Sequence, residues 1–358
     1  MRDALLRMVS REGKAGHLGA RLFALCLAAA RMLLVVATTF LGLLAVTFFI
    51  GRVIPVDPVL FIAGDNASSE VMERIREDMG FNKSLAEQFV IYVRHAASGD
   101  LGESILTNRQ VVDDIKRVFP ATIELATLAT LIGALVGIPL GVIGAVNAGR
   151  LPDQIVRVVA LIGHSVPIFW LGLLGLLVFY AQLGWVAGPG RVNVAFEYTF
   201  QPITGFYVVD AIMQGDWAAL RSILSHMILP ASLLGYYSMA YICRMTRSFM
   251  LSELEQEYVI AARAKGLSER RIVWGHALRS AAVPLVTVIA LSYAVLLEGA
   301  VLTETVFSWP GLGLYITNSL QAADMNAVLG GTLVVGVVFV GINLLSDLLY
   351  RSLDPRTK

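Results

Sequence analysis

Residues 257–284, EYVIAARAKGLSERRIVWGHALRSAAVP, form a polar, strongly basic segment between two long apolar runs. The adjacent small residues Ala261 and Ala262 leave little side-chain volume on one helical face, and Gly266 follows closely. Glycine readily adopts the left-handed conformation that ends a helix. The segment therefore predicts one helix that stops at Gly266 and a second helix with Ser268 as its N-cap. Such a helix–turn–helix is suited to lie outside a membrane and press closely against another protein.

The composition of the chain indicates a membrane protein. Of its 358 residues, 56% are hydrophobic and 15% are charged, against about 25% charged in an average soluble domain. Pro139, Pro167 and Pro284 interrupt three of the apolar stretches, which membrane helices tolerate where neighbours satisfy the freed backbone groups. We expect an all-α integral membrane protein. A length of about twenty apolar residues per span predicts six spans, at 31–51, 121–146, 155–183, 226–245, 280–303 and 327–349.

Lysine and arginine are concentrated on one side of these spans. Eighteen of the 28 basic residues lie in or beside the N-terminus, residues 147–154, residues 246–279 and the C-terminus. Because cytoplasmic loops carry the excess of positive charge, both termini and residues 246–279 are predicted to be cytoplasmic. The predicted organisation begins with a cytoplasmic lead-in at 1–30, for which a cleaved signal peptide is the alternative. A first span at 31–51 and an extracytoplasmic domain at 52–120 follow. The transmembrane core covers 121–349 and contains the cytoplasmic loop 246–279, and the cytoplasmic tail covers 350–358.

Several further stretches, taken with Ala261-Ala262 and Gly266, resemble one family: the permease subunits of ABC importers of the dipeptide, oligopeptide and nickel class. The acidic residue that precedes the alanine pair in that family is replaced here by Ile260, and the nearest acidic residue is Glu257. The stretches that carry the resemblance are IPVDP at 54–58, GDLG at 99–102, SVPIFW at 165–170, HMILP at 226–230, RMTRS at 244–248 and LTETVFSWPGLG at 302–313.

The resemblance implies a type I ABC importer permease fold in a bacterial inner (plasma) membrane. It implies a second permease subunit in a heterodimer, two ATPase subunits, an extracytoplasmic substrate-binding protein and surrounding lipid as partners. The carried solutes would be peptides, nickel complexes, opines or related small molecules. The first helix of the loop would dock in a groove of the ATPase through Ala261 and Ala262, with Tyr258 as an aromatic anchor. Arg263 and Lys265 would make polar contacts, and Gly266 would set the turn. Glu257 would be the acidic residue of the site.

The chain itself lacks the chemistry of ATP hydrolysis. A phosphate-binding loop needs G-x-x-x-x-G-K-[ST], yet Lys14 is the one lysine that follows a glycine, and Ala15 comes next. The five histidines are scattered and define no metal site, and the net charge of +1 gives no reason to expect nucleic-acid binding. We therefore expect a non-catalytic subunit without a cofactor of its own, with ATP and Mg²⁺ bound by the partner ATPase.

Three carboxylates fall inside the predicted spans, where a charge costs at least about 2.5 kcal/mol and indicates function by default. Glu124 and Asp347 lie near span ends and are expected to reach the interface. Glu298 is deeper and, with Gly299, is predicted to line the translocation path between two permease subunits. The alternative is an ion-gradient-driven carrier that uses Glu298 in proton coupling. Trp309 is expected to anchor the chain at the membrane interface.

Overall fold

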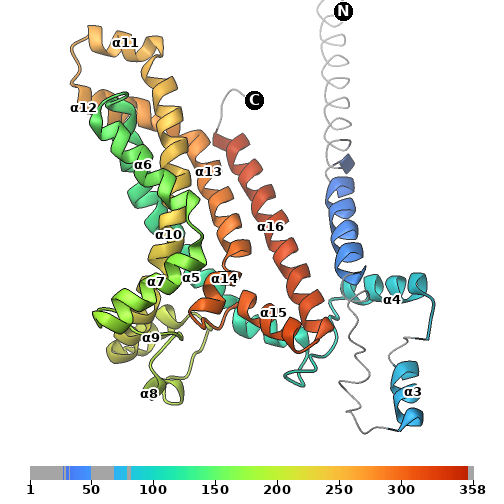
Figure 1. The fold of residues 1–358 in the computed structure, drawn as a ribbon. Coiled ribbons are helices and arrows are strands. Elements are labelled where there is room, and N and C mark those ends of the chain that lie inside the picture. Colours follow the sequence, from blue (N-terminus) through green and yellow to red (C-terminus); the bar gives the residue numbers. More distant parts are fainter. Residues whose placement is uncertain (1–26, 28–29, 32, 50–67, 79–81, 354–358) are drawn as a thin grey trace, which may run out of the picture.

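The computed structural model describes residues 27, 30–31, 33–49, 68–78 and 82–353, and the regular elements of this part are helices (Figure 1). Four helical runs within it are long and apolar enough to span a membrane. They are α5 (Val111–Val146), α10 (Trp217–Leu254), the run Glu269–Gly299 that ends in α13 (Leu278–Gly299), and the first part of α16 (Met325–Leu353). The chain is thus the all-α membrane protein that its composition predicts.

The other two predicted spans differ from straight membrane-crossing helices. The third is a pair of helical segments bent by 96°: α6 (Leu151–Ser165) is followed by α7 (Ile168–Gly175) and the π-helix η1 (Leu176–Gln182). The break falls at Pro167, where the sequence predicts an interruption. The first predicted span contains the shorter apolar helix Leu33–Phe49.

Two other predicted interruptions are wrong, because α5 continues through Pro139 and α13 continues through Pro284. Proline removes one backbone donor, but a membrane helix persists where neighbouring helices and local adjustments satisfy the freed carbonyl. The start of the second span also differs from the prediction. α5 begins at Val111 rather than at residue 121 and carries Pro120 as well.

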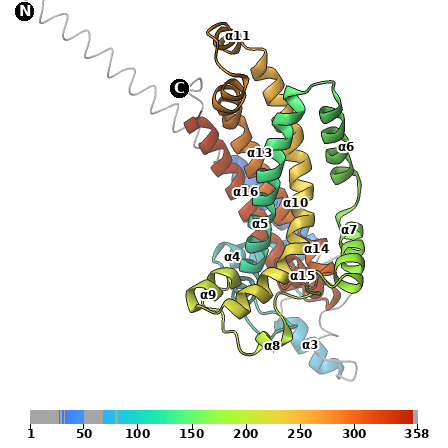
Figure 2. The ribbon, with the colours of Figure 1, turned by 90° about the vertical axis from the view of Figure 1, so that its left-hand side faces the viewer.

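Short helices occupy the two ends of the bundle (Figures 1 and 2). One end carries α8 (Val194–Glu197), α9 (Tyr207–Gln214), α14 (Val301–Val306) and α15 (Leu312–Gln321). The other end carries α11 (Glu257–Ala264), α12 (Glu269–Arg271) and the π-helix η2 (Ile272–Ala277).

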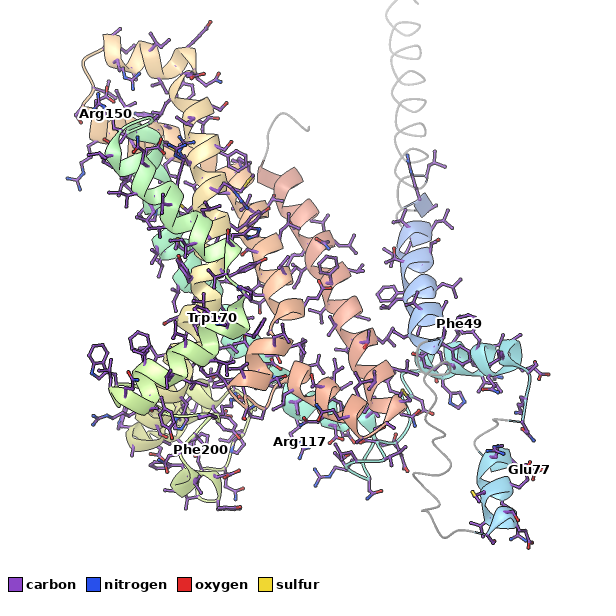
Figure 3. All side chains as sticks on the ribbon, in the orientation of Figure 1. Phe49, Glu77, Arg117, Arg150, Trp170 and Phe200 are labelled. Atoms are coloured by element: carbon purple, nitrogen blue, oxygen red, sulfur yellow. The ribbon has the colours of Figure 1, made fainter. Side chains whose placement is uncertain are left out.

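The helix Leu33–Phe49 stands beside α16 and meets the amphipathic helix α4 (Leu85–Ala97), where Figure 3 labels Phe49. The ring centroid of Phe48 lies 5.3 Å from that of Phe89 and 5.9 Å from that of Tyr92, both in α4. Ser84 begins α4 with a capping box, because its side chain accepts from the Glu87 backbone while the Glu87 carboxylate accepts from the Ser84 backbone. A second short helix, α3 (Ser69–Asp78), lies nearby.

α5 and α10 form the central contact of the bundle, and glycines allow it. A Cβ atom built on Gly133 would lie 2.5 Å from the Ser238 hydroxyl, and one built on Gly141 would lie 2.6 Å from the Cys243 carbonyl oxygen. Gly137, halfway between, would place its Cβ 3.0 Å from the Met239 carbonyl oxygen. Small residues repeated every four positions let two membrane helices approach backbone to backbone.

Candidate coupling site and translocation path

α11 projects from one end of the bundle, where it follows α10 and lies crosswise to it (Figure 1). It ends as the sequence predicts, because Gly266 has φ +79° and closes the helix. The Gly266 N–H donates to the Arg263 carbonyl at 2.9 Å, and the Leu267 N–H donates to the Ala262 carbonyl at 3.2 Å. These two bonds define a Schellman motif. A Cβ at Gly266 would meet nothing within 4 Å, so the backbone conformation alone requires glycine.

The outer face of α11 carries uncovered apolar side chains. Ile260 is 58% exposed, Tyr258 is 40% exposed and Ala261 is also exposed, whereas Val259 points inward and is fully buried. The Tyr258 hydroxyl donates to Glu253 Oε2 at 2.6 Å, which fixes the ring against the end of α10. Partial burial, reinforced by the Glu253 carboxylate, raises the pKa of Tyr258 above its usual value. The phenol therefore stays protonated and keeps this bond at neutral pH.

The charged residues predicted for the site occupy different places around the turn. Arg263 Nε donates to Glu269 Oε1 at 2.8 Å, so an exposed ion pair bridges α11 and α12 across Gly266. That pairing raises the pKa of Arg263 further. Glu257 lies in the first turn of α11, where a negative charge complements the helix dipole. Lys265 is exposed at the C-cap, and Ala262 is partly buried.

The segment after the turn is anchored in the bundle. Ser268 occupies the predicted N-cap position of α12, but its side chain makes no capping hydrogen bond there. α12 is short and continues directly into η2, whose Val273 and Ala277 pack in a cluster with Val142 of α5 and Met250 of α10. π-helical turns are rare and frequently occur at functional sites. The segment after the turn is thus joined to α5, α10 and α13 through one apolar cluster.

Glu298 and Gly299 lie together near the end of α13, and both are exposed. Glu298 borders a narrow gap that also touches Phe119 of α5, Leu312 of α15 and Phe339 of α16. Within the described residues, the Glu298 carboxylate has no hydrogen bond or ion pair, and a Cβ on Gly299 would meet nothing within 4 Å. The Glu298 carboxylate is therefore unpaired among these residues and lies on an exposed stretch of α13.

Glu124 is buried and paired instead of extending to the surface of the molecule. Its side chain is 9% exposed, and its Oε2 accepts from the Arg191 guanidinium at 2.5 Å. Its Oε1 accepts from the Val208 backbone N–H at 2.7 Å. Arg191 lies before α8 and Val208 lies in α9, so a distant part of the chain, rather than water, neutralises this carboxylate. The side chain of Asp347 lies outside the part that the structure describes.

Trp309 is not an interfacial anchor either. It is fully buried, and its indole Nε1 donates to the Ala121 carbonyl at 3.0 Å. Close by, Glu304 is also fully buried and accepts from the Thr122 hydroxyl at 2.7 Å and from the Leu314 N–H at 3.0 Å. Sequence reasoning missed Glu304 because it lies just beyond the predicted span. The sequence signal that could have pointed to Glu304 is the turn Trp309–Gly313 that follows it.

A metal site is not found among the described side chains, where no group of three or more His, Cys, Asp or Glu residues could hold an ion. His226 lies inside α10, and its Nδ1 is 2.7 Å from the Ser222 carbonyl oxygen. His164 ends α6 and stacks on Tyr237, with ring centroids 5.6 Å apart. Both rings have protein partners of their own.

Comparisons with known proteins agree on one family. A family model described as the binding-protein-dependent transport system inner membrane component matches residues 137–358, and its N-terminal companion matches residues 25–126. The chain is 43% identical to the probable D,D-dipeptide transport system permease protein DdpB of Escherichia coli K12, over 88% of this chain and 92% of that protein. It is 40% identical to the di/tripeptide transport system permease protein DppB of Pseudomonas aeruginosa, over 92% of this chain and 98% of that protein.

Among solved structures, the MetNI methionine ABC transporter in inward-facing conformations is similar over 65% of this chain and 93% of its own, with 19% identity and a TM-score of 0.48. The family and sequence matches favour an ABC permease over the ion-gradient carrier. They identify a non-catalytic, multi-pass inner-membrane component. The chain belongs to the family of binding-protein-dependent transport system inner membrane components and is a permease subunit of an ABC importer.

Proposed function

We propose that this chain forms one half of the translocation path of an ATP-driven importer of peptides or closely related small solutes, and that α11 couples the path to a separate ATPase. The observation that carries the proposal is the outer face of α11, where Ile260 and Tyr258 are exposed beyond the end of the bundle. Apolar side chains held on a rigid projecting helix fit a groove on another protein. The names of the relatives, which are dipeptide and di/tripeptide permeases, support the substrate class.

The proposed complex holds this chain, a second permease subunit in a heterodimer, two ATPase subunits that bind ATP and Mg²⁺, and an extracytoplasmic substrate-binding protein. In this arrangement α11 and both termini face the cytoplasm, and residues 52–120 contribute an extracytoplasmic domain. Alternating access is the proposed mechanism. Closure of the ATPase pair moves α11, and the cluster of Val142, Met250, Val273 and Ala277 carries that movement into the spans.

The coupling role is tested by placing a charge on the exposed face of α11. Ile260→Arg should lower the amount of ATPase that co-purifies with the tagged chain and abolish ATP-dependent uptake, while the chain still folds because the position is exposed. Ile203→Arg is the matched control, because Ile203 is 68% exposed at the opposite end of the molecule. Normal ATPase recovery and uptake with Ile260→Arg would exclude α11 as the docking element.

The path is tested at Glu298. We propose that its open carboxylate faces the solute and contacts the amino group of a peptide. Glu298→Gln should raise the KM for peptides with a free amino terminus and leave that for N-acetylated peptides unchanged. An equal change for both kinds of peptide, or none for either, would remove Glu298 from the path. Comparison of dipeptides with nickel complexes and opines in the same assay tests the solute class.

A further inference from the structure

A cavity of about 480 Å³ lies between α6 and α10. Figure 2 shows these two helices side by side in the half of the bundle that carries α11. Its lining residues lie within 156–161 of α6 and 240–251 of α10. Figure 3 labels Arg150, which precedes α6, at the same end as α12. The cavity is separate from Glu298 and from the exposed face of α11, so neither the proposed path nor the docking helix accounts for it.

Three guanidinium groups line this cavity: those of Arg157, Arg244 and Arg247. No acidic side chain lines it within the described part of the chain. Asp153, which is buried beside it, binds Arg247 through two bonds of 2.6 and 2.9 Å and lies 3.7 Å from Arg157. Asp153 pairs with Arg247 and Arg157, whereas no ion pair is found for Arg244 among the described residues, so three permanent positive charges meet one carboxylate and the site can bind an anion.

Asp153 also builds the site. Its Oδ2 accepts from the Gly149 N–H at 2.9 Å, so the carboxylate that holds Arg247 is itself fixed to the α5–α6 connection. Arg247 is consequently oriented, with its side chain 24% exposed. Arg157 is 57% exposed, and Arg244 is exposed with its guanidinium 5.8 Å from the Tyr241 ring centroid. The Ser248 hydroxyl adds an uncharged donor to the lining.

The rest of the lining is apolar, and so is the surface around it. Val156, Cys243 and Leu251 contribute to the walls. On α6, the side chains of Leu151, Ile155, Val158 and Leu161 are 55–72% exposed. A charged recess beside an exposed apolar helix face matches a phospholipid, whose phosphate is anionic and whose chains are apolar. Basic pockets between membrane helices on the cytoplasmic side are known to bind anionic headgroups.

We propose that this cavity binds the phosphate of an anionic phospholipid headgroup at the cytoplasmic surface. Arg157 and Arg244 supply the exposed charges, Arg247 is the donor held in place by Asp153, and the apolar face of α6 receives an acyl chain. A bound headgroup would contact both α6 and α10 and would hold the two helices together close to α11.

The test uses the whole transporter complex, purified in neutral detergent and measured by native mass spectrometry with added phosphatidylglycerol. Wild type should retain the lipid. Arg157→Gln and Arg244→Gln should each weaken retention about fivefold, as expected for one arginine near an anionic lipid. Arg221→Gln is the matched control and should bind like wild type, because Arg221 is exposed at the other end of the same helix.

Two further arms identify the source of the phosphate. Phosphatidylcholine carries the same phosphate without net charge and should be retained more weakly. Inorganic phosphate at millimolar concentration should not displace phosphatidylglycerol, and displacement would assign the cavity to a soluble anion and overturn the lipid proposal. The proposal is also overturned if the complex retains no phosphatidylglycerol, which is the result expected if the second permease subunit fills the cavity. Equal loss of the lipid in Arg221→Gln would overturn it as well. None of these outcomes depends on peptide uptake.

Discussion

The α14–α15 end of the bundle and the turn between α11 and α12 are held together in opposite ways. At the end with α14 and α15, buried polar groups join residues far apart in sequence: Glu304 and Thr122 are 182 positions apart, and Arg191 and Glu124 are 67 apart. At the turn between α11 and α12, exposed groups join near neighbours: Arg263 and Glu269 are six positions apart, and Tyr258 and Glu253 are five apart. The first region is closed by its own chain, whereas the second leaves the apolar side chains of Tyr258 and Ile260 exposed.

This difference has an energetic side. Removing one partner of a buried ion pair strands the other charge and costs about 3–5 kcal/mol, whereas an exposed ion pair contributes about 0–1 kcal/mol. Substitutions at the α14–α15 end should therefore lower stability, and substitutions at the α11–α12 turn should change the proposed coupling with little loss of stability.

The largest effect is expected for Arg191→Met. The substitution leaves the Glu124 carboxylate buried without its cation and should lower the free energy of unfolding by about 3–5 kcal/mol. Unfolding in detergent measures the loss. The double variant Glu124→Gln with Arg191→Met should be less damaged than the single one, because no charge is stranded. A loss below about 1 kcal/mol for Arg191→Met, the range of an exposed pair, would contradict the contrast between the two ends.

Glu304→Ala should come next. It leaves the Thr122 hydroxyl and the Leu314 N–H without an acceptor, and a buried group without its partner costs about 1–3 kcal/mol. The measurement is again unfolding in detergent. Glu304→Gln is the control, since its amide oxygen can still accept one of these bonds and the loss should be smaller. Equal losses for both variants would mean that side-chain volume, rather than hydrogen bonding, holds this position.

Gly266→Ala sharpens the comparison at the other end. Because φ is +79° and the surrounding space is open, the penalty is the left-handed conformation alone, about 1–2 kcal/mol. We expect a small loss of stability and a clear drop in transport per ATP hydrolysed. Gly275→Ala is the control, because Gly275 lies within η2 and has no positive φ. If Gly275→Ala lowered uptake as much as Gly266→Ala, the conformation of the turn would not be the cause of the coupling defect.

The smallest effect is expected for the pair across that turn. Arg263→Gln should change the free energy of unfolding by no more than about 1 kcal/mol, because both partners are exposed. A double-mutant cycle with Glu269→Gln isolates the pair energy, which salt should reduce further. A coupling energy above about 2 kcal/mol would place this pair in the range of buried ones.

The same contrast explains what the sequence predicts. The turn at Gly266 depends on one residue and its neighbours, so a short stretch predicts it correctly. The burial of Trp309 and the pairing of Glu124 depend on partners supplied by Ala121 and Arg191, which no local pattern identifies. Both residues lie where a span ends and a loop begins, and there the sequence favours an interfacial position. Only the fold shows that other parts of the chain cover them.

The glycine-lined contact of α5 with α10 has a mechanical consequence. The two helices contain 36 and 38 residues, so at 1.5 Å per residue each is about 55 Å long. Because their backbones approach closely, we expect the two helices to tilt together. Over that length, a tilt of only about 5° swings the far tip by roughly 5 Å. Leverage, rather than a relay of local rearrangements, would then carry a small push on one side of the bilayer to the opening on the other.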